Sequence, residues 1–171
     1  MIGIRAWLCS RSVRVVGVLV LAVWCVSCSK QTDDGADPKV TTLGGAEVTG
    51  RLVEILGLEE WEGKFPSNDL GYDYVYVLKY SILETHRGKV ESDTILVGQY
   101  NPLKPRSEAA DARCPEIGGN LRRFRAGDLH RMALDEPLDD HYMGPIINKY
   151  FKETGGKGVV YWAVWTNRVI R

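Results

Sequence analysis

The sequence predicts a mainly β protein, built as one small barrel of five antiparallel strands with one or two short helices. Residues 73–84 alternate in period two, with tyrosines at one parity, which is typical of a half-buried antiparallel strand. Short apolar runs separated by glycine- and proline-rich breaks continue over residues 47–171. Closure into a barrel would remove the exposed edges that a solitary sheet of this size must protect.

Five β-forming runs follow one another along the predicted domain. The expected strands are 47–56, 73–84, 93–100, 129–134 and 159–169. The turn at 86–89 joins the second and third runs as a hairpin. Pro102 and Pro105 end the third run, because proline cannot donate a hydrogen bond to a ladder.

The segments between these runs predict two short helices and several loops. Ser107 can cap one or two helical turns over 107–113, and Pro145 can begin a short helix over 145–151. Residues 59–69 are dense in breakers and predict a long connection. Five strands with a short helix between the third and fourth resemble the element order of the OB-fold, which makes the predicted domain an OB-like barrel.

Residues 1–27 have the form of a secretory signal. Arg5, Arg11 and Arg14 precede an apolar run of about a dozen residues, too short to span a bilayer that needs roughly 20. Cys28 directly follows the small residue Ser27, which resembles the signal of bacterial lipoproteins. That resemblance implies a signal helix, removal of residues 1–27, and lipidation of Cys28, with palmitate as the expected kind of acyl chain.

Residues 28–46 are polar and rich in glycine, aspartate and threonine. Such a stretch buries little apolar surface and predicts a flexible tether between the lipid and the barrel domain of residues 47–171. The tether would hold the barrel off the membrane surface. Cys114 would be the only other cysteine of the mature chain, which leaves no intrachain disulfide and predicts a structural thiol rather than a nucleophile.

The charges of the chain are balanced, with 22 basic and 22 acidic side chains. This balance gives no basic footprint for nucleic acid. A local basic cluster is formed by Arg122, Arg123 and Arg125, with Arg131 close behind. The cluster has two interpretations, a solvated loop or a contact for an anion or acidic polysaccharide.

Aromatic side chains gather on two of the expected strands and have two interpretations. They would form a flat platform for sugar rings or a protein if they face outward, or fill a small barrel if they face inward. The candidate ligand-binding residues are therefore Tyr74, Tyr76, Tyr80, Tyr161, Trp162 and Trp165, together with Arg122, Arg123 and Arg125.

Residues suited to acid–base chemistry are few and show no recognised motif. His130, Asp139, Asp140 and His141 would have to converge in a pocket to support a hydrolase or transferase. Three protein ligands, as catalytic zinc requires, are not suggested by the spacing. The sequence therefore predicts no catalytic residue, no metal and no cofactor.

Two stretches, 74–88 and 124–134, resemble the second and fourth strands of netrin-like domains related to the tissue inhibitors of metalloproteinases. With Tyr161-Trp162-Ala163, they also look like a small β domain of bacterial alginate-type polysaccharide O-acetylation proteins. These resemblances imply binding of a protein or polysaccharide and carry over no catalytic residue.

The expected function is that of a lipid-anchored, non-catalytic binding or accessory module of the cell envelope, facing the periplasm or the surface. Its expected ligand is a polysaccharide, or a protein partner in polysaccharide export or modification. Two alternatives remain: an envelope hydrolase or transferase using the region of His130, Asp139, Asp140 and His141, and a purely structural assembly lipoprotein.

Overall fold

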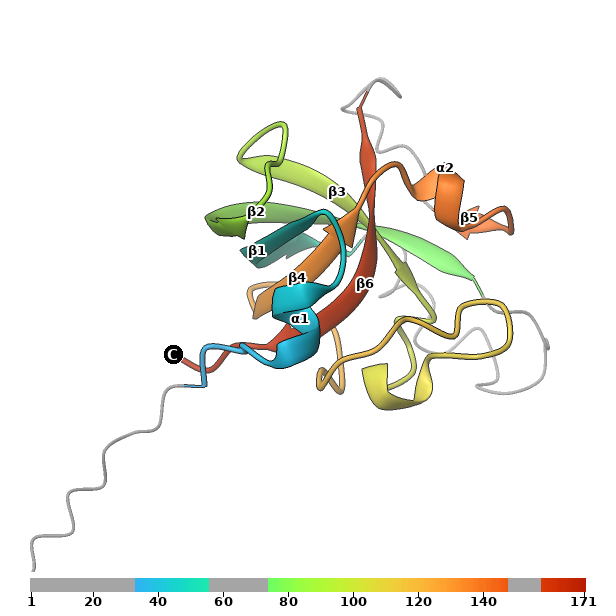
Figure 1. Ribbon diagram of the computed structural model, residues 1–171, viewed down its shortest axis with the longest axis horizontal. Helices are drawn as coiled ribbons and strands as arrows, with labels where there is room; N and C mark the ends of the chain where they lie inside the picture. Colours follow the sequence, from blue (N-terminus) through green and yellow to red (C-terminus); the bar gives the residue numbers. More distant parts are fainter. Residues whose placement is uncertain (1–32, 56–73, 148–157) are drawn as a thin grey trace, which may run out of the picture. The chain divides into compact units, whose positions relative to one another are not determined.

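The computed structural model describes residues 33–55, 74–147 and 158–171. Within them, five strands close into a barrel: β1 (Ala46–Glu54), β2 (Val75–Arg87), β3 (Thr94–Tyr100), β4 (Leu129–Asp135) and β6 (Val160–Arg168). The order around the barrel is β1-β4-β6-β3-β2, and pairing of β1 with β2 closes it (Figure 1). β4 returns to lie beside β1, which is the Greek-key arrangement. The prediction of a mainly β protein built as a closed five-stranded barrel is confirmed.

The sequence predicted that all five strands are antiparallel, and this is wrong for one pair. β3 and β6 run parallel, with Leu96 opposite Val160 and Gly98 opposite Trp162. The reason is geometric, because an odd number of strands in a closed ring cannot alternate direction all the way round. At least one neighbouring pair must be parallel, and in this barrel it is β3 and β6.

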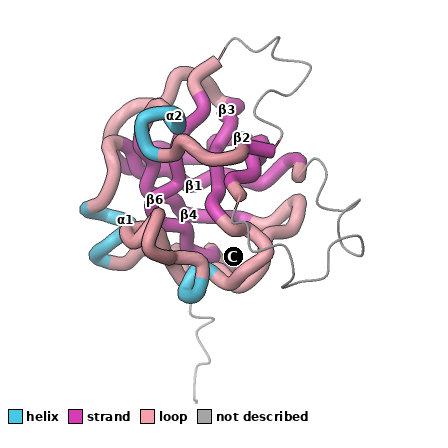
Figure 2. Tube along the Cα trace, turned by 90° about the vertical axis from the view of Figure 1, so that its right-hand side faces the viewer, coloured by secondary structure: helices cyan, strands magenta, loops and turns pink. Residues whose placement is uncertain are grey.

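The short elements lie outside the barrel wall (Figure 2). They are α1 (Pro38–Thr42), the 3-10 turn η1 (Arg106–Glu108), α2 (Leu138–His141) and β5 (Ile146–Ile147). The helix predicted over 107–113 is therefore only a 3-10 turn at its start. The helix predicted over 145–151 is wrong at Ile146–Ile147, because these two residues form β5 and pair in parallel with Val75 and Tyr76 of β2. Residues 148–151 lie outside the described part of the chain. The predicted connection 59–69 also lies outside it.

The side chains that point into the barrel form its inner core. They come from all five strands and include Leu52, Leu78, Tyr80, Met132 and Tyr161. Leu121 and Phe124, from the loop before β4, pack on the same core. The barrel is thus filled by large side chains, which a domain of this size needs.

A second, outer core covers the other face of β2, β3 and β6. Val77, Tyr100 and Trp162 pack there against Cys114 from the segment after β3 and Leu138 from α2. The prediction of a half-buried second strand is therefore wrong over 75–78, where both faces are buried. Cys114 is 1% exposed, so its thiol is buried in this core.

Residues 33–45, most of the predicted flexible tether, are folded against β4 and β6 and form what we name the N-terminal strap. Asp37 caps α1, and Val40 of that helix is fully buried. The folded part therefore begins before Glu47, earlier than predicted. Residues 28–32, Cys28 and the predicted signal 1–27 lie outside the described residues. No helix among those described has the length and apolarity needed to cross a membrane.

Candidate functional site

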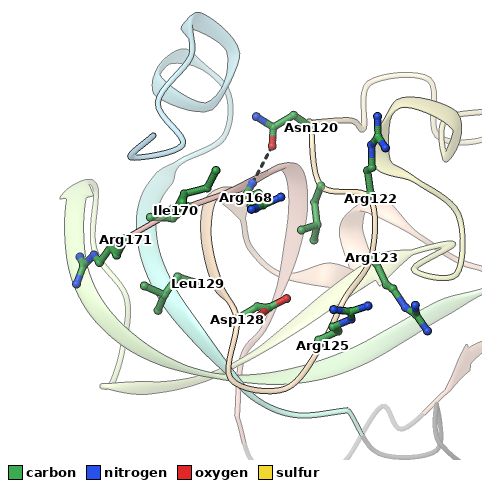
Figure 3. A pocket seen from close by; sticks show the side chains of 11 residues that line it. Asn120, Arg122, Arg123, Arg125, Asp128, Leu129, Arg168, Ile170 and Arg171 are labelled. Carbon is green, nitrogen blue, oxygen red and sulfur yellow. Dashed lines mark hydrogen bonds between the residues drawn. The ribbon is translucent and has the colours of Figure 1, made fainter. Parts of the chain in front are cut away.

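An open groove of about 570 Å³ lies at the end of the barrel where β4 begins and β6 ends (Figure 3). Five arginines line it: Arg122, Arg123, Arg125, Arg168 and Arg171. Asp128 is the one acidic side chain in the lining, and Leu129, Val169 and Ile170 supply apolar surface. We name this feature the arginine groove.

One wall of the groove is the loop before β4, in which apolar residues are interspersed with arginines. Leu121 and Phe124 point into the inner core and are 3% and 8% exposed. Between and after them, Arg122, Arg123 and Arg125 are exposed. Burial of the two apolar anchors thus turns all three arginines toward solvent.

Hydrogen bonds attach this loop to β6. The Asn120 side-chain Oδ1 accepts from the backbone N of Arg168 at 2.7 Å (Figure 3). The backbone N of Asn120 donates to Asn167 Oδ1 at 3.0 Å. The far end of the loop is held by β1, where Gly127 N donates to Leu52 O at 2.7 Å. Both ends of the wall are therefore fixed on rigid strands.

The opposite wall comes from the end of the chain. Register across the β4–β6 ladder places Arg168 opposite His130, and Arg171 follows three residues later. Arg122, Arg123 and Arg125 are predicted from the sequence as candidate binding residues, whereas Arg168 and Arg171 are not. No local signal marks those two, because only strand pairing brings them beside a loop more than 40 residues earlier.

The groove concentrates positive charge on a chain whose total charge is balanced. The side chains of Arg122, Arg125, Arg168 and Arg171 form no ion pair with another described residue. Arg131, the fourth member of the sequence cluster, points elsewhere and pairs with Glu47 and Asp34. Guanidinium groups donate in a planar fork that matches carboxylate, sulfate and phosphate oxygens. The groove is therefore suited to an anion.

The aromatic candidates do not form an exposed platform. Tyr76, Tyr80 and Tyr161 lie in the inner core and Trp162 in the outer core, each 5% exposed or less. The interpretation in which the aromatic side chains fill the barrel is the correct one for the three tyrosines, whereas Trp162 is buried on the outer face of the wall. Tyr74 is only partly buried, and it packs against the inner core.

Trp165 is also partly buried, and the N-terminal strap covers it. Its Nε1 donates to Asp37 at 3.1 Å, and Lys39 Nζ lies 4.5 Å from the ring centroid. This ring therefore holds the strap and is not available as a sugar platform.

A polar cluster is enclosed beneath the inner core. Tyr80 Oη and His130 Nδ1 are 2.9 Å apart, and the His130 ring meets the Phe124 ring edge-on at 5.4 Å. Burial lowers the pKa of His130 to about 4 and that of Arg106 to about 10. Arg106 Nη2 donates to the carbonyls of Tyr100 and Asn101, both at 2.6 Å. Tyr80, His130 and Arg106 are each at most 2% exposed, so we assign this cluster a structural role.

The hydrolase or transferase interpretation is not supported by the geometry. His130 is fully buried within the inner core. Asp139, Asp140 and His141 lie on α2, outside the wall, where the His141 ring stacks on Trp162 at 6.2 Å. Within the described ranges, no three His, Cys, Asp or Glu side chains gather as a metal site would require. The four residues do not converge.

Comparison of the chain with family models, with curated protein sequences and with solved structures found no match. The arginine groove and its surroundings are therefore interpreted from their own chemistry.

Proposed function

We propose that the chain is a non-catalytic binding module of the cell envelope that recognises an acidic polysaccharide through the arginine groove. One observation carries the proposal: five arginines from two distant segments meet around one groove whose lining holds a single acidic side chain. Repeating carboxylate or sulfate groups on a sugar chain present the planar oxygens that guanidinium groups bind in pairs.

The rest of the lining suits a sugar. Leu129, Val169 and Ile170 offer apolar surface to the carbon face of a pyranose ring, while Asn120 and the arginines supply polar atoms. A volume of about 570 Å³ is in the range of small-molecule sites and accommodates a few sugar units of a longer chain. An open groove also lets a polymer pass through, which a closed pocket would not.

In this proposal, Cys28 carries a lipid that holds the module at the membrane, and the module serves polysaccharide export or modification as an accessory protein. The sequence around Cys28 supports this part. Mass spectrometry of the mature N-terminus tests it, with an acylated Cys28 as the expected result and loss of the mass increment in Cys28→Ser. An intact chain or an unmodified Cys28 would remove the anchor from the proposal.

Binding of alginate, an acidic polysaccharide, and dextran, a neutral one, tests the groove. We expect alginate to bind and dextran not to bind. The double variant Arg122→Glu/Arg125→Glu should weaken alginate binding about tenfold or more, since each charge-assisted contact contributes about 1.5–3 kcal/mol.

Lys89→Glu is the matched control, because it reverses an exposed charge in the β2–β3 turn, outside the groove lining. It should leave alginate binding unchanged. Equal binding of the two polysaccharides would contradict the proposal. An equal loss of alginate binding in the groove variant and in the control would also contradict it.

A further inference from the structure

The N-terminal strap crosses the barrel from one end to the other. At its start, Asp33 O accepts from the backbone N of Ile170 at 2.8 Å, and Ile170 lines the arginine groove. At its other end, Gly44 O accepts from Arg87 Nη1 at 2.7 Å, beside the β2–β3 turn. The chain therefore arrives at the barrel on the groove end.

Several contacts hold the strap in place between these ends. Arg131 Nη1 lies 3.1 Å from Asp34 Oδ2, and Asn167 Nδ2 donates to Gly35 O at 2.7 Å. Asp37 binds Trp165, and Val40 is buried against the barrel. The strap is thus part of the folded domain, and it does not lengthen the connection to the lipid.

This docking shortens the link to the membrane. Eighteen residue steps separate Cys28 from Ala46 and would reach about 65 Å if all were extended. Only five steps separate Cys28 from Asp33, and they reach about 18 Å at most. A lipid on Cys28 would therefore keep Asp33, and the groove beside it, within about 18 Å of the membrane surface.

The opposite end of the barrel is farther away. Leu52 N donates to Asp128 O at the groove loop, whereas Ala46, six residues earlier on the same strand, lies beside Gly88 in the β2–β3 turn. Six strand residues span about 20 Å. The link therefore favours an orientation in which the groove faces the membrane and the β2–β3 turn points away from it.

We propose that the ligand of the arginine groove is the acidic glycan headgroup of a lipid in the anchoring membrane. The inference rests on the proposed function and names the source of the acidic sugar. A groove held this close to the membrane meets glycans fixed at the surface at high effective concentration, whereas a free polysaccharide must enter the narrow space beneath the barrel.

The test uses the mature, acylated chain in phosphatidylcholine vesicles that contain an acidic glycolipid (a ganglioside), phosphatidylglycerol, or neither. A fluorophore is placed in the groove loop by Ala126→Cys or in the far turn by Lys89→Cys, both at exposed positions. Buried Cys114 is protected from labelling. Energy transfer to an acceptor on the lipid headgroups reports which end of the barrel faces the membrane.

We expect stronger transfer from position 126 than from position 89, with the largest difference on ganglioside vesicles. A Gly/Ser insertion after Thr32 that lengthens the five-residue link about fivefold should reduce this difference. The insertion should also lower about tenfold the alginate concentration that displaces the groove from the ganglioside headgroups. The reason is that the effective concentration of a tethered site falls as the −3/2 power of the linker length. Binding of free alginate by the detergent-solubilised protein should not change.

The outcomes separate this inference from the proposed function. Equal transfer from both positions, or stronger transfer from position 89, overturns the membrane-facing orientation even if alginate binds. Equal results on ganglioside and phosphatidylglycerol vesicles overturn the glycan assignment in favour of plain headgroup charge. Failure of the detergent-solubilised protein to bind alginate through the groove overturns the proposed function itself.

Discussion

The Asp37 carboxylate holds the N-terminal strap through several hydrogen bonds. It accepts from the backbone N of Lys39 at 2.8 Å and of Val40 at 2.9 Å, as a helix N-cap does. It also accepts from Trp165 Nε1 at 3.1 Å and from Asn167 Nδ2. Burial acts to raise the pKa of Asp37, but the hydrogen bonds outweigh it and the net shift is downward. The ionised carboxylate therefore holds the strap.

Asp37→Ala should lower the free energy of unfolding by about 1–2 kcal/mol at pH 7, the usual cost of losing a helix cap. Because the pKa is lowered on folding, this contribution is present above its ordinary value of 3.8 and is lost as the pH falls through the folded-state pKa. Urea denaturation at pH 7 and pH 3 measures both effects. Asp93→Ala, an exposed carboxylate, is the control and should cost little.

His130 is the residue whose titration should be visible in stability. It is fully buried, and burial lowers its pKa from 6.5 to about 4. Its Nδ1 pairs with Tyr80 Oη, but its Nε2 has no hydrogen-bond partner among the described residues, so a proton on that nitrogen would be buried without an acceptor. The folded barrel therefore keeps His130 neutral, while the unfolded chain protonates it below about pH 6.5.

We expect the free energy of unfolding to fall by up to about 3 kcal/mol as the pH drops from 6.5 to 4, since each unit of pKa difference corresponds to about 1.4 kcal/mol. The stabilisation is complete above pH 6.5, where both states hold a neutral ring. Denaturation curves across this window measure the slope. His130→Phe should abolish most of it, and an unchanged slope in that variant would contradict the assignment to His130.

At the scale of elements, the groove loop depends on its close approach to β6. Gly118 N donates to Val164 O at 3.0 Å, and Thr166 N donates to Gly118 O at 2.9 Å. Gly119 then has φ +133°, and a Cβ there would lie 1.9 Å from Thr166 O. Only glycine permits this backbone approach, which brings the arginine wall against the strand end.

Gly119→Ala should destabilise the barrel strongly and disturb the groove, because the loop would have to move away from β6. Gly127→Ala is the matched control at the other end of the loop: φ is +92°, but no atom lies within 4 Å of the added Cβ. It should cost only about 1–2 kcal/mol of backbone strain. Thermal unfolding and alginate binding compare the two, and equal effects would contradict the steric explanation.

The ladder between β1 and β4 contains a second element-scale contact, the pair of Glu47 and Arg131. Nε and Nη2 of Arg131 each lie 2.7 Å from Glu47 Oε1, and the Glu47 side chain is 4% exposed. Arg131 also reaches Asp34, so it joins the strap to both strands. Removing one partner of a buried pair leaves the other charge uncompensated.

Glu47→Gln should therefore lower the free energy of unfolding by about 3 kcal/mol. Glu91→Gln, at an exposed position, provides the comparison and should change stability little. Urea denaturation of both variants measures the difference. A cost for Glu47→Gln no larger than that for Glu91→Gln would show that the pair does not hold β1 and β4 together.

At the scale of the whole molecule, balanced total charge coexists with a strongly basic groove. The chain has 22 basic and 22 acidic residues, yet five arginines and only one acidic side chain line the groove. Acidic side chains such as Glu47, Asp34 and Asp37 are bound by the strap contacts and the barrel instead. The local electrostatic potential of the groove, and not the net charge of the chain, therefore governs which ligands the molecule attracts.

Alginate binding should therefore weaken steeply with salt despite the neutral chain. Raising the ionic strength from about 0.1 M to about 1 M shortens the Debye length from about 10 Å to about 3 Å, which screens the groove. Isothermal titration at several salt concentrations measures the slope. The slope should be smaller in Arg122→Glu/Arg125→Glu and unchanged in Lys89→Glu.

The sequence alone determined the class of fold and most strand positions. Alternation over 73–84, and the breakers near Gly88, Pro102 and Gly127, are local properties that act before any distant contact forms. The loop arginines Arg122, Arg123 and Arg125 were also readable, because exposed charges cluster along the chain itself. The polar strap was not, since its hydrogen bonds to Trp165 and Asn167 join residues about 130 positions apart.

The tertiary structure alone decided which strands are neighbours, and with them the site. Closing five strands required a parallel pair, which is β3 and β6, and the outer core buried the second face of β2 and the ring of Trp162. The same closure brought Arg168 and Arg171 to the loop arginines. The periodicity of apolar and polar side chains predicts which residues share one face of a strand. Pairing between distant segments decides what covers each face and which charged side chains lie together.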